Sequence, residues 1–209
     1  MSCGRAVDQA CLVRPGRLYG KIPRMMPADE DPRDFPPRSV MPGLVHERLI
    51  VLSRPTVAAW IESFRAFPQG LEFDLFVATA PEVVARNEYG GSAIEFDRRG
   101  SNDEDLFELG VSTAGQETSN ASKATWPGRR MEPTELLLRP QSGGGGDAGI
   151  GGYWRMTWWL TPLPTTGQVE FWCRWKSGEI PRSAAVIDAT RFTRAADSAS
   201  PLWTGSPPG

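Results

Sequence analysis

Between residues 45 and 203 the chain mainly alternates apolar and polar side chains, which is typical of strands with one buried face. The clearest alternation runs over residues 71–77. The preceding residues, 67–70, have proline in the second position and glycine in the fourth, as a type I turn prefers. We therefore predict a hairpin formed by residues 57–66 and 71–79, although the apolar positions of its first arm also fit a helix.

Two aromatic segments, residues 153–160 and 169–175, form the other strong pair of strands. They are joined by turn-forming residues 161–168, so we expect antiparallel neighbours whose register this loop leaves open. The residues that share the apolar face are Trp154, Met156, Trp158 and Leu160 in the first strand and Val169, Phe171, Cys173 and Trp175 in the second. Weaker strands are predicted at residues 47–53, 106–113, 135–139 and 183–188.

The other segments of this region predict one helix and two long connections. Residues 191–198 carry an apolar strip at helical spacing, and Asp188 or Thr190 is placed to cap the helix. Residues 81–105 and 114–134 lack a clear pattern for most of their length and are predicted as connections.

Seven or so short strands, each with one polar face, predict a mainly β fold, an antiparallel two-sheet β-sandwich with a short C-terminal helix. Residues 44–203 form this domain. Residues 1–43 are rich in proline and arginine without apolar periodicity, so we expect a disordered or extended N-terminal tail, within which Met25 or Met26 is an alternative start. Residues 204–209 form a short C-terminal tail. One core should contain Phe73, Leu75, Trp158 and Phe171.

The amino-acid composition argues against several classes of protein, among them nucleic-acid-binding, membrane-spanning and metal-binding proteins. The 209 residues include 23 basic and 25 acidic ones, with no basic block that would indicate a nucleic-acid partner. No apolar run reaches the length of a membrane span, and none resembles a secretory signal, so we expect a cytoplasmic protein. The cysteines, Cys3, Cys11 and Cys173, are odd in number and match no zinc spacing, and His46 is the only histidine. We therefore predict no disulfide framework, no metal site and no cofactor.

Few segments suggest catalysis. The glycine-rich residues 142–152 are predicted as a flexible loop, because a phosphate-binding loop needs a lysine and a following helix. Glu72 and Asp74 share one strand face about 6–7 Å apart, a separation that glycoside hydrolysis allows. A hydrolase acting on a glycan or an ester, with Glu72, Asp74 or His46 as candidates, is therefore the alternative function. The acidic residues 102–105 lack the spacing of a calcium loop and are predicted to be solvated.

The aromatic residues, which include eight tryptophans, favour a binding surface. Strand alternation places Trp159 and Trp172 opposite the core face, together with Tyr153 and the charged residues Arg155 and Arg174. These five residues are the predicted binding site, for another copy of this chain, another protein or a glycan. Alternatively, a tail, the last helix or the glycine loop covers both indoles.

Residues 45–203 resemble a family of uncharacterised proteins of GC-rich Gram-positive bacteria. The resemblance rests on the glycine run, the aromatic strand from Tyr153 to Leu160, Pro162-Leu163-Pro164, Gly167, the pattern Val169-x-Phe171-x-Cys173-x-Trp175, Ile180-Pro181, Ile187-Asp188 and Leu202-Trp203. Arg174 stands where the family tends to carry an acidic residue. The resemblance implies a compact β-rich fold and no activity. The expected function is a non-catalytic cytoplasmic binding module, or, as a further alternative, a carbohydrate-binding module that uses surface tryptophans.

Overall fold

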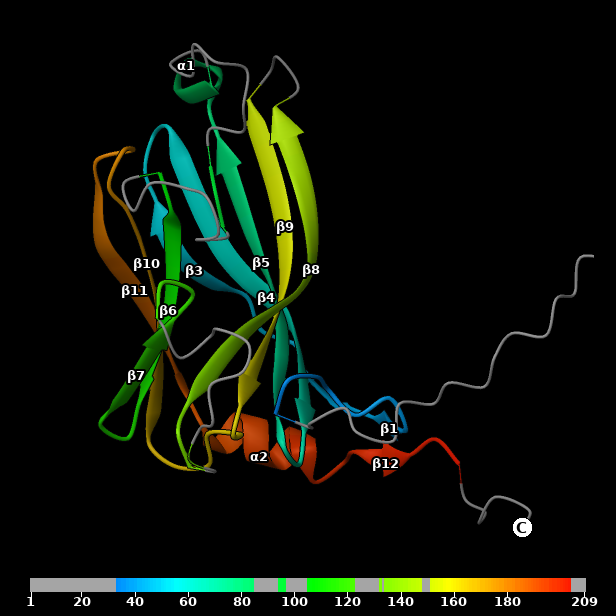
Figure 1. Ribbon diagram of the computed structural model, residues 1–209. Coiled ribbons are helices and arrows are strands. Elements are labelled where there is room, and N and C mark those ends of the chain that lie inside the picture. Colours follow the sequence, from blue (N-terminus) through cyan, green and yellow to red (C-terminus); the bar gives the residue numbers. More distant parts are fainter. Residues whose placement is uncertain are drawn as a thin grey trace, which may run out of the picture.

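A computed structural model describes residues 33–84, 94–96, 105–122, 132, 134–147 and 151–203. The described chain is mainly β, with two antiparallel sheets facing each other and a short helix near the C-terminal end (Figure 1). This confirms the predicted fold class. The predicted tail up to residue 32, the C-terminal tail 204–209 and most of the acidic run lie outside the described residues.

The larger sheet has six strands in the order β2-β4-β5-β9-β8, with β3 also paired to β4. Its strands are β2 (Gly43–Val45), β3 (Leu49–Ser53), β4 (Val57–Phe67), β5 (Gly70–Thr79), β8 (Leu137–Asp147) and β9 (Gly152–Thr161). Strands β4 and β5 form the predicted hairpin, in which Phe67 pairs with Gly70 at the turn. The helical alternative for its first arm is wrong, because β4 is hydrogen-bonded to three strands, β2, β3 and β5, and its apolar residues pack in the core.

The smaller sheet has the order β11-β10-β6-β7. Its strands are β6 (Phe107–Thr113), β7 (Gln116–Ser119), β10 (Gln168–Trp175) and β11 (Ile180–Asp188). Strand β7 lies in a segment that was predicted to be a connection. It forms because Ala114 and Gly115 both have positive φ angles, 48° and 79°, which turn the chain back onto β6 within two residues.

Strands β9 and β10 are not neighbours, contrary to the prediction. Strand β9 pairs with β5 and β8 in the larger sheet, whereas β10 pairs with β6 and β11 in the smaller one. The loop between them is long enough to cross from one sheet to the other (Figure 1). Because of this crossing, the apolar residues of the two strands lie in one core from opposite sheets.

The prediction of a flexible loop over residues 142–152 is wrong for residues 142–147, which form the second half of strand β8. At Gly143 and Gly145, atoms of β9 occupy the space that a side chain would need. A Cβ on Gly143 would lie 2.1 Å from Met156 Sδ, and one on Gly145 would lie 2.3 Å from the Tyr153 carbonyl oxygen. Glycine therefore permits close approach within a regular strand.

The core lies between the sheets and contains all four predicted residues, Phe73, Leu75, Trp158 and Phe171, each fully buried. The rings of Phe73 and Phe171, from opposite sheets, meet edge to face with 5.1 Å between their centroids. On one side of the sandwich the hydroxyl of Ser183 on β11 donates to the Val51 carbonyl on β3, at 2.7 Å. This bond ties the edges of the two sheets together.

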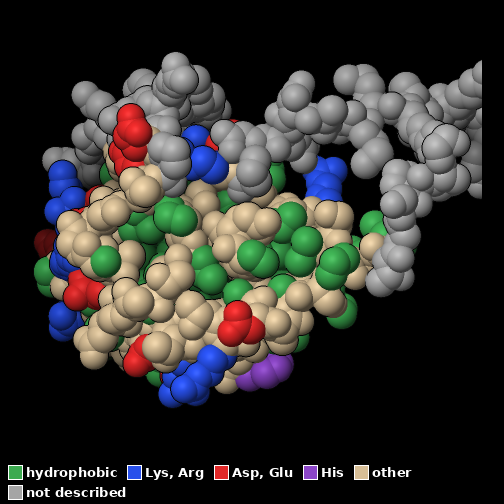
Figure 2. Space-filling view, turned by 90° about the horizontal axis from the view of Figure 1, so that it is seen from below, with side chains coloured by type: hydrophobic (Ala, Val, Ile, Leu, Met, Phe, Trp, Pro, Cys, Tyr) green, Lys and Arg blue, Asp and Glu red, His purple; other side chains and the backbone are tan. Residues whose placement is uncertain are grey.

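Helix α2 (Thr190–Ala196) confirms the predicted short helix near the C-terminal end, and it closes one end of the sandwich (Figure 1). Phe192 inserts into the core, 5.4 Å from the Phe64 ring, and the Asp188 carboxylate accepts a hydrogen bond from the Thr190 backbone N–H at 2.8 Å. Seen from this end, apolar side chains gather in the middle and charged ones lie around them (Figure 2).

Three short elements complete the described chain: α1 (Pro81–Val84), β1 (Val40–Met41) and β12 (Ser200–Pro201). The last part of the predicted tail is attached to the domain, since β1 pairs with β12 and Asp34 forms an ion pair with Arg139 at 2.9 Å. No helix in the described ranges is long and apolar enough to cross a membrane.

Candidate functional site

The five predicted site residues separate onto two faces of the molecule. Tyr153, Arg155 and Trp159 belong to β9 of the larger sheet, whereas Trp172 and Arg174 belong to β10 of the smaller sheet. They therefore form no single site. Moreover, Trp159 is 0% exposed and Trp172 is 4% exposed, so neither indole is an open platform.

Neighbouring residues of the same sheet cover both indoles. The Phe67 ring packs edge-on against Trp159, 5.6 Å between centroids, and Gly70 leaves the space that the Trp159 ring fills. On the other sheet, Gly110 lies under Trp172 and the Arg182 guanidinium lies 4.3 Å from the centroid of its ring. Alternation correctly puts both residues opposite the core, but a large indole can lie flat over a glycine and be buried there.

The outer face of the smaller sheet carries several ion pairs between neighbouring strands. Arg182 bonds Glu117 at 2.9 Å and Glu170 at 2.5 Å, and Arg174 bonds Glu108. Desolvation raises the pKa of Glu117, but hydrogen bonds from Ser112 and Arg182 outweigh it and leave this pKa below its ordinary value. Most of these side chains are exposed, so this face is typical of a solvated surface.

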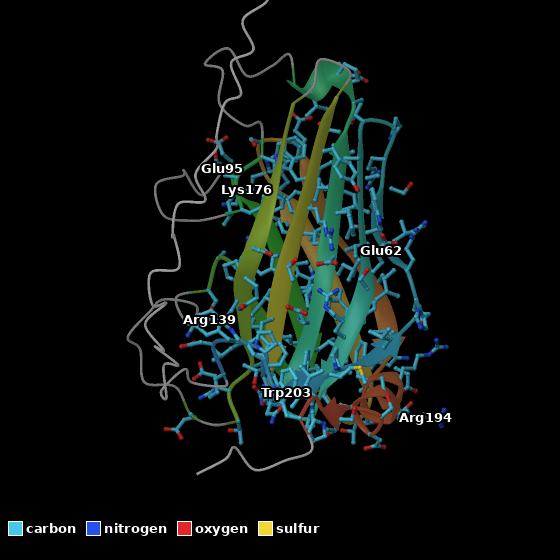
Figure 3. All side chains as sticks on the ribbon, turned by 90° about the vertical axis from the view of Figure 1, so that its right-hand side faces the viewer. Glu62, Glu95, Arg139, Lys176, Arg194 and Trp203 are labelled. Carbon is cyan, nitrogen blue, oxygen red and sulfur yellow. The ribbon has the colours of Figure 1, made fainter. Side chains whose placement is uncertain are left out.

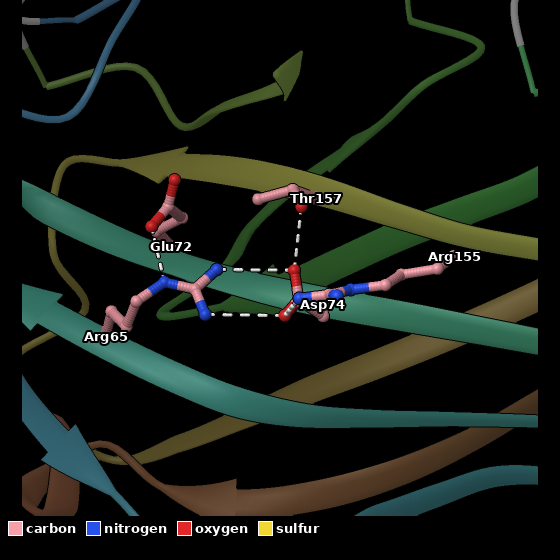
Figure 4. A network of polar contacts seen from close by, with 5 residues as sticks. All are labelled: Arg65, Glu72, Asp74, Arg155 and Thr157. Atoms are coloured by element: carbon pink, nitrogen blue, oxygen red, sulfur yellow. Dashed lines mark hydrogen bonds and ion pairs between the residues drawn. The ribbon is translucent and has the colours of Figure 1, made fainter. Parts of the chain in front are cut away.

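The outer face of the larger sheet carries a buried carboxylate, that of Asp74 on β5 (Figure 4). The Arg65 guanidinium bonds both of its oxygens at 3.3 Å, Arg155 donates to it at 2.8 Å, and the Thr157 hydroxyl donates at 2.7 Å. Arg65 also bonds the Glu72 carboxylate at 2.5 Å. Three adjacent strands, β4, β5 and β9, supply these side chains. Desolvation raises the pKa of Asp74, but the hydrogen bonds outweigh it and hold this pKa below its ordinary value.

This network is a poor catalytic pair. A glycosidase needs one carboxylic acid that stays protonated near neutral pH, but Asp74 is held ionised, and the same guanidinium binds both Glu72 and Asp74. The third hydrolase candidate, His46, is exposed on the segment between β2 and β3 and has no place in the network. The arrangement is suited to fixing Arg155 in one position.

Beside this network lies a group of three aromatic side chains, of which the sequence pattern singled out Tyr153 alone. Trp60 on β4 and Phe76 on β5 are register partners whose rings stack 5.3 Å apart and within 7° of parallel. Tyr153 on β9 lies 6.2 Å from Trp60 and 6.0 Å from Phe76 and is 50% exposed. The Arg155 guanidinium lies over the Phe76 ring at 5.6 Å.

The exposed Ile50 on β3 extends this group by one strand, because it is the register partner of Trp60. We call these five residues, Ile50, Trp60, Phe76, Tyr153 and Arg155, the outer-face cluster. Figure 3 looks onto this face of the larger sheet, where β8, β9, β5 and β4 lie side by side. The sequence signal was present but missed: Trp60 and Phe76 are aromatic residues at positions where alternation calls for polar ones.

Comparison of the chain with protein-family models, with curated proteins and with solved structures finds no match. The resemblance noted from the sequence stays a prediction.

Proposed function

We propose that this chain is a non-catalytic, cytoplasmic protein-binding module and that the outer-face cluster is its binding surface. The observation that carries the proposal is a Trp-Phe-Tyr group with an arginine on a sheet face that the fold does not use for its core. Large aromatic side chains and arginine dominate the energetically important positions of protein interfaces.

The ring arrangement favours a protein over a glycan as the partner. A sugar stacks on an open aromatic face, but Trp60 and Phe76 turn one face of each ring toward the other, and Phe76 is only 9% exposed. Tyr153 is the one substantially exposed ring of the group, and Ile50 is exposed beside the stacked pair. An exposed tyrosine ring and an exposed aliphatic side chain are suited to contact with apolar side chains of a protein.

The cluster is also held in place before any partner arrives. Trp60 and Phe76 are stacked, and Arg155 is fixed by its hydrogen bond to the buried Asp74. Binding would therefore immobilise few side chains, which lowers the entropic cost of association.

Site-specific photo-crosslinking in the native cells tests this function. A benzophenone amino acid replaces Tyr153 or, separately, Ile50, and a matched control replaces Val186, which is 47% exposed on the smaller sheet. We expect the same protein to be crosslinked from both cluster positions, to be absent from the control, and to be lost when Trp60→Ala is added. Identical products from all three positions, or no product from the cluster, would refute the proposal. A glycan or a second copy of this chain as the product would contradict the proposed partner class.

A further inference from the structure

The larger sheet ends at β8, and in the described part of the chain no strand pairs with the other edge of β8. The first half of β8 is covered, since the Gln141 side chain donates to the Asp34 carbonyl at 2.9 Å and Arg139 pairs with Asp34. Residues 142–146, the second half, are all exposed. Backbone N–H and C=O groups on such an edge point toward any polypeptide that approaches it.

This half of the edge lacks the usual protection against pairing. Proteins blunt sheet edges with charged side chains, proline or a bulge. Here Pro140 and the bulge after it precede the exposed half, and residues 142–146 carry no charge and no proline. The edge therefore stays regular and open over five residues, about 17 Å at the rise of a strand.

The described part of the chain does not require glycine at two positions of this edge. A Cβ on Gly144 or Gly146 would meet nothing within 4 Å, and neither residue has a positive φ angle. Glycine in the middle of a strand is less stabilising than alanine, so its presence at both positions has a cost for the fold. Their register partners are Arg155 and Tyr153, so the space above them adjoins the outer-face cluster directly.

We propose that β8 accepts an added β-strand from the partner protein, antiparallel or parallel to residues 142–146, and that bulky side chains of that strand lie over Gly144 and Gly146 against Arg155 and Tyr153. This inference rests on the proposed function and specifies how the partner binds. Only an extended polypeptide presents N–H and C=O groups at the spacing of a sheet edge. Strands two apart are separated by about 10 Å, a gap that a tyrosine or phenylalanine side chain of the added strand and the facing side chain of Arg155 or Tyr153 can close together across the glycines.

A second copy of this chain is a poor occupant. Pairing β8 with β8 of another copy would set glycine opposite glycine and bury little apolar surface, far short of the area that stable interfaces need. A strand with large apolar side chains at alternate positions fills the same space with complementary shape. The outer-face cluster supplies the apolar contact that the backbone hydrogen bonds lack.

The test uses the full chain, labelled with ¹⁵N, and the capped peptide Lys-Thr-Tyr-Thr-Tyr-Thr-Tyr-Thr-Lys. We expect amide shifts confined to residues 142–146 and to β9 near Tyr153, saturating near about 1 mM peptide. The same peptide with every backbone amide N-methylated cannot donate to the edge and should bind at least about tenfold more weakly. Equal binding of both peptides, or no shift at β8, would overturn strand addition.

A pair of variants gives the complementary control. Gly144→Lys with Gly146→Lys fills the open space and charges the edge, and we expect it to weaken peptide binding at least about tenfold. Ala184→Lys with Val186→Lys adds the same charges at exposed positions of β11 in the smaller sheet, two residues apart on one strand face, and should leave binding unchanged. Thermal unfolding of both variants checks that they fold.

These outcomes separate the two proposals. If the methylated peptide still shifts Tyr153 and loses that effect in Trp60→Ala, the outer-face cluster binds but strand addition is wrong. If crosslinking at Tyr153 fails while the unmethylated peptide binds β8, the edge pairs but the cluster is not the native binding surface. A dimer in sedimentation equilibrium that disappears in the Gly144→Lys, Gly146→Lys variant would show that the occupant is a second copy, against our proposal.

Discussion

Two adjacent glycines of β8 should respond in opposite ways to the same substitution. In Gly144→Ala the new methyl group meets nothing within 4 Å. In Gly145→Ala it would lie 2.3 Å from the Tyr153 carbonyl oxygen and 2.5 Å from Trp154 Cα, both of which are backbone atoms of the neighbouring strand. Flexible side-chain movement cannot relieve that contact, so β8 and β9 would have to move apart.

The expected size of the effect is the difference in free energy of unfolding between the two variants, in which the intrinsic preference of a strand for alanine over glycine cancels. Both variants gain the roughly 0.5–1 kcal/mol by which alanine exceeds glycine in a strand. Only Gly145→Ala also suffers overpacking, which costs about 1–3 kcal/mol. The free energy of unfolding should therefore differ by about 1–3 kcal/mol between the variants, with Gly144→Ala above wild type.

Urea unfolding monitored by tryptophan fluorescence measures this difference, with thermal unfolding as a second probe. For a chain of this size 1 kcal/mol corresponds to about 2–4 °C in Tm. Equal stabilities for the two variants would refute the assignment of Gly145 to the side of the strand that faces Trp154. A loss of stability in Gly144→Ala would refute the open space above that residue and, with it, the room for an added strand.

The remaining predictions address the core, the charge network and the buried thiol. Phe73→Ala should lower the free energy of unfolding, measured with urea, by about 3–5 kcal/mol, and Trp159→Ser should lower it by a similar amount because its ring is covered. A loss of less than about 1 kcal/mol in either variant would contradict the burial of that side chain. Asp74→Asn should lower the free energy of unfolding by about 2–3 kcal/mol at pH 7. This is somewhat less than the loss on breaking a fully buried ion pair, because the Arg155 side chain is partly solvated. Since the folded-state pKa of Asp74 lies below its ordinary value, this stabilisation is present above about pH 4 and lost as the pH falls further, so the gap between wild type and variant should close in acid. Burial raises the pKa of Cys173 to about 12, so at pH 8 about one thiol in ten thousand is ionised, and peptide mapping should find Cys173 alkylated by iodoacetamide only after unfolding.

Local alternation predicted the elements far better than their partners. The hairpin of β4 and β5 was predictable because its turn residues and its apolar face lie within one short segment. The pairing of β9 with β5 was not, because it joins segments far apart in the chain and the loop between β9 and β10 permits either a hairpin or a crossing. Strand pairing in a sandwich is decided by the whole core and not by the nearest turn.

The candidate site was predicted in part. Tyr153 and Arg155 do lie on the outer face, as alternation indicates, but Trp159 lies there too and is covered by Phe67. The alternation of apolar and polar residues predicts the face of the sheet on which a side chain lies. It does not predict whether neighbouring side chains on that face bury it. Trp60 was missed because its strand was judged by its apolar positions alone.

The crossing between β9 and β10 has a consequence for biosynthesis. Consecutive segments of the chain belong alternately to the two sheets, so β5 can pair with β9, and β6 with β10, only after the later strand has been synthesised. Asp74 and Arg155, which bond across β5 and β9, are 81 residues apart in sequence. Such a high contact order slows folding, and a chain emerging from the ribosome exposes the open edges of β5 and β6 until β9 and β10 have been made. A fragment that ends before β10 contains all six strands of the larger sheet but only β6 and β7 of the smaller one. The larger sheet would then have no complete second sheet to pack against, so the domain should fold in one late step after nearly all of it has been synthesised.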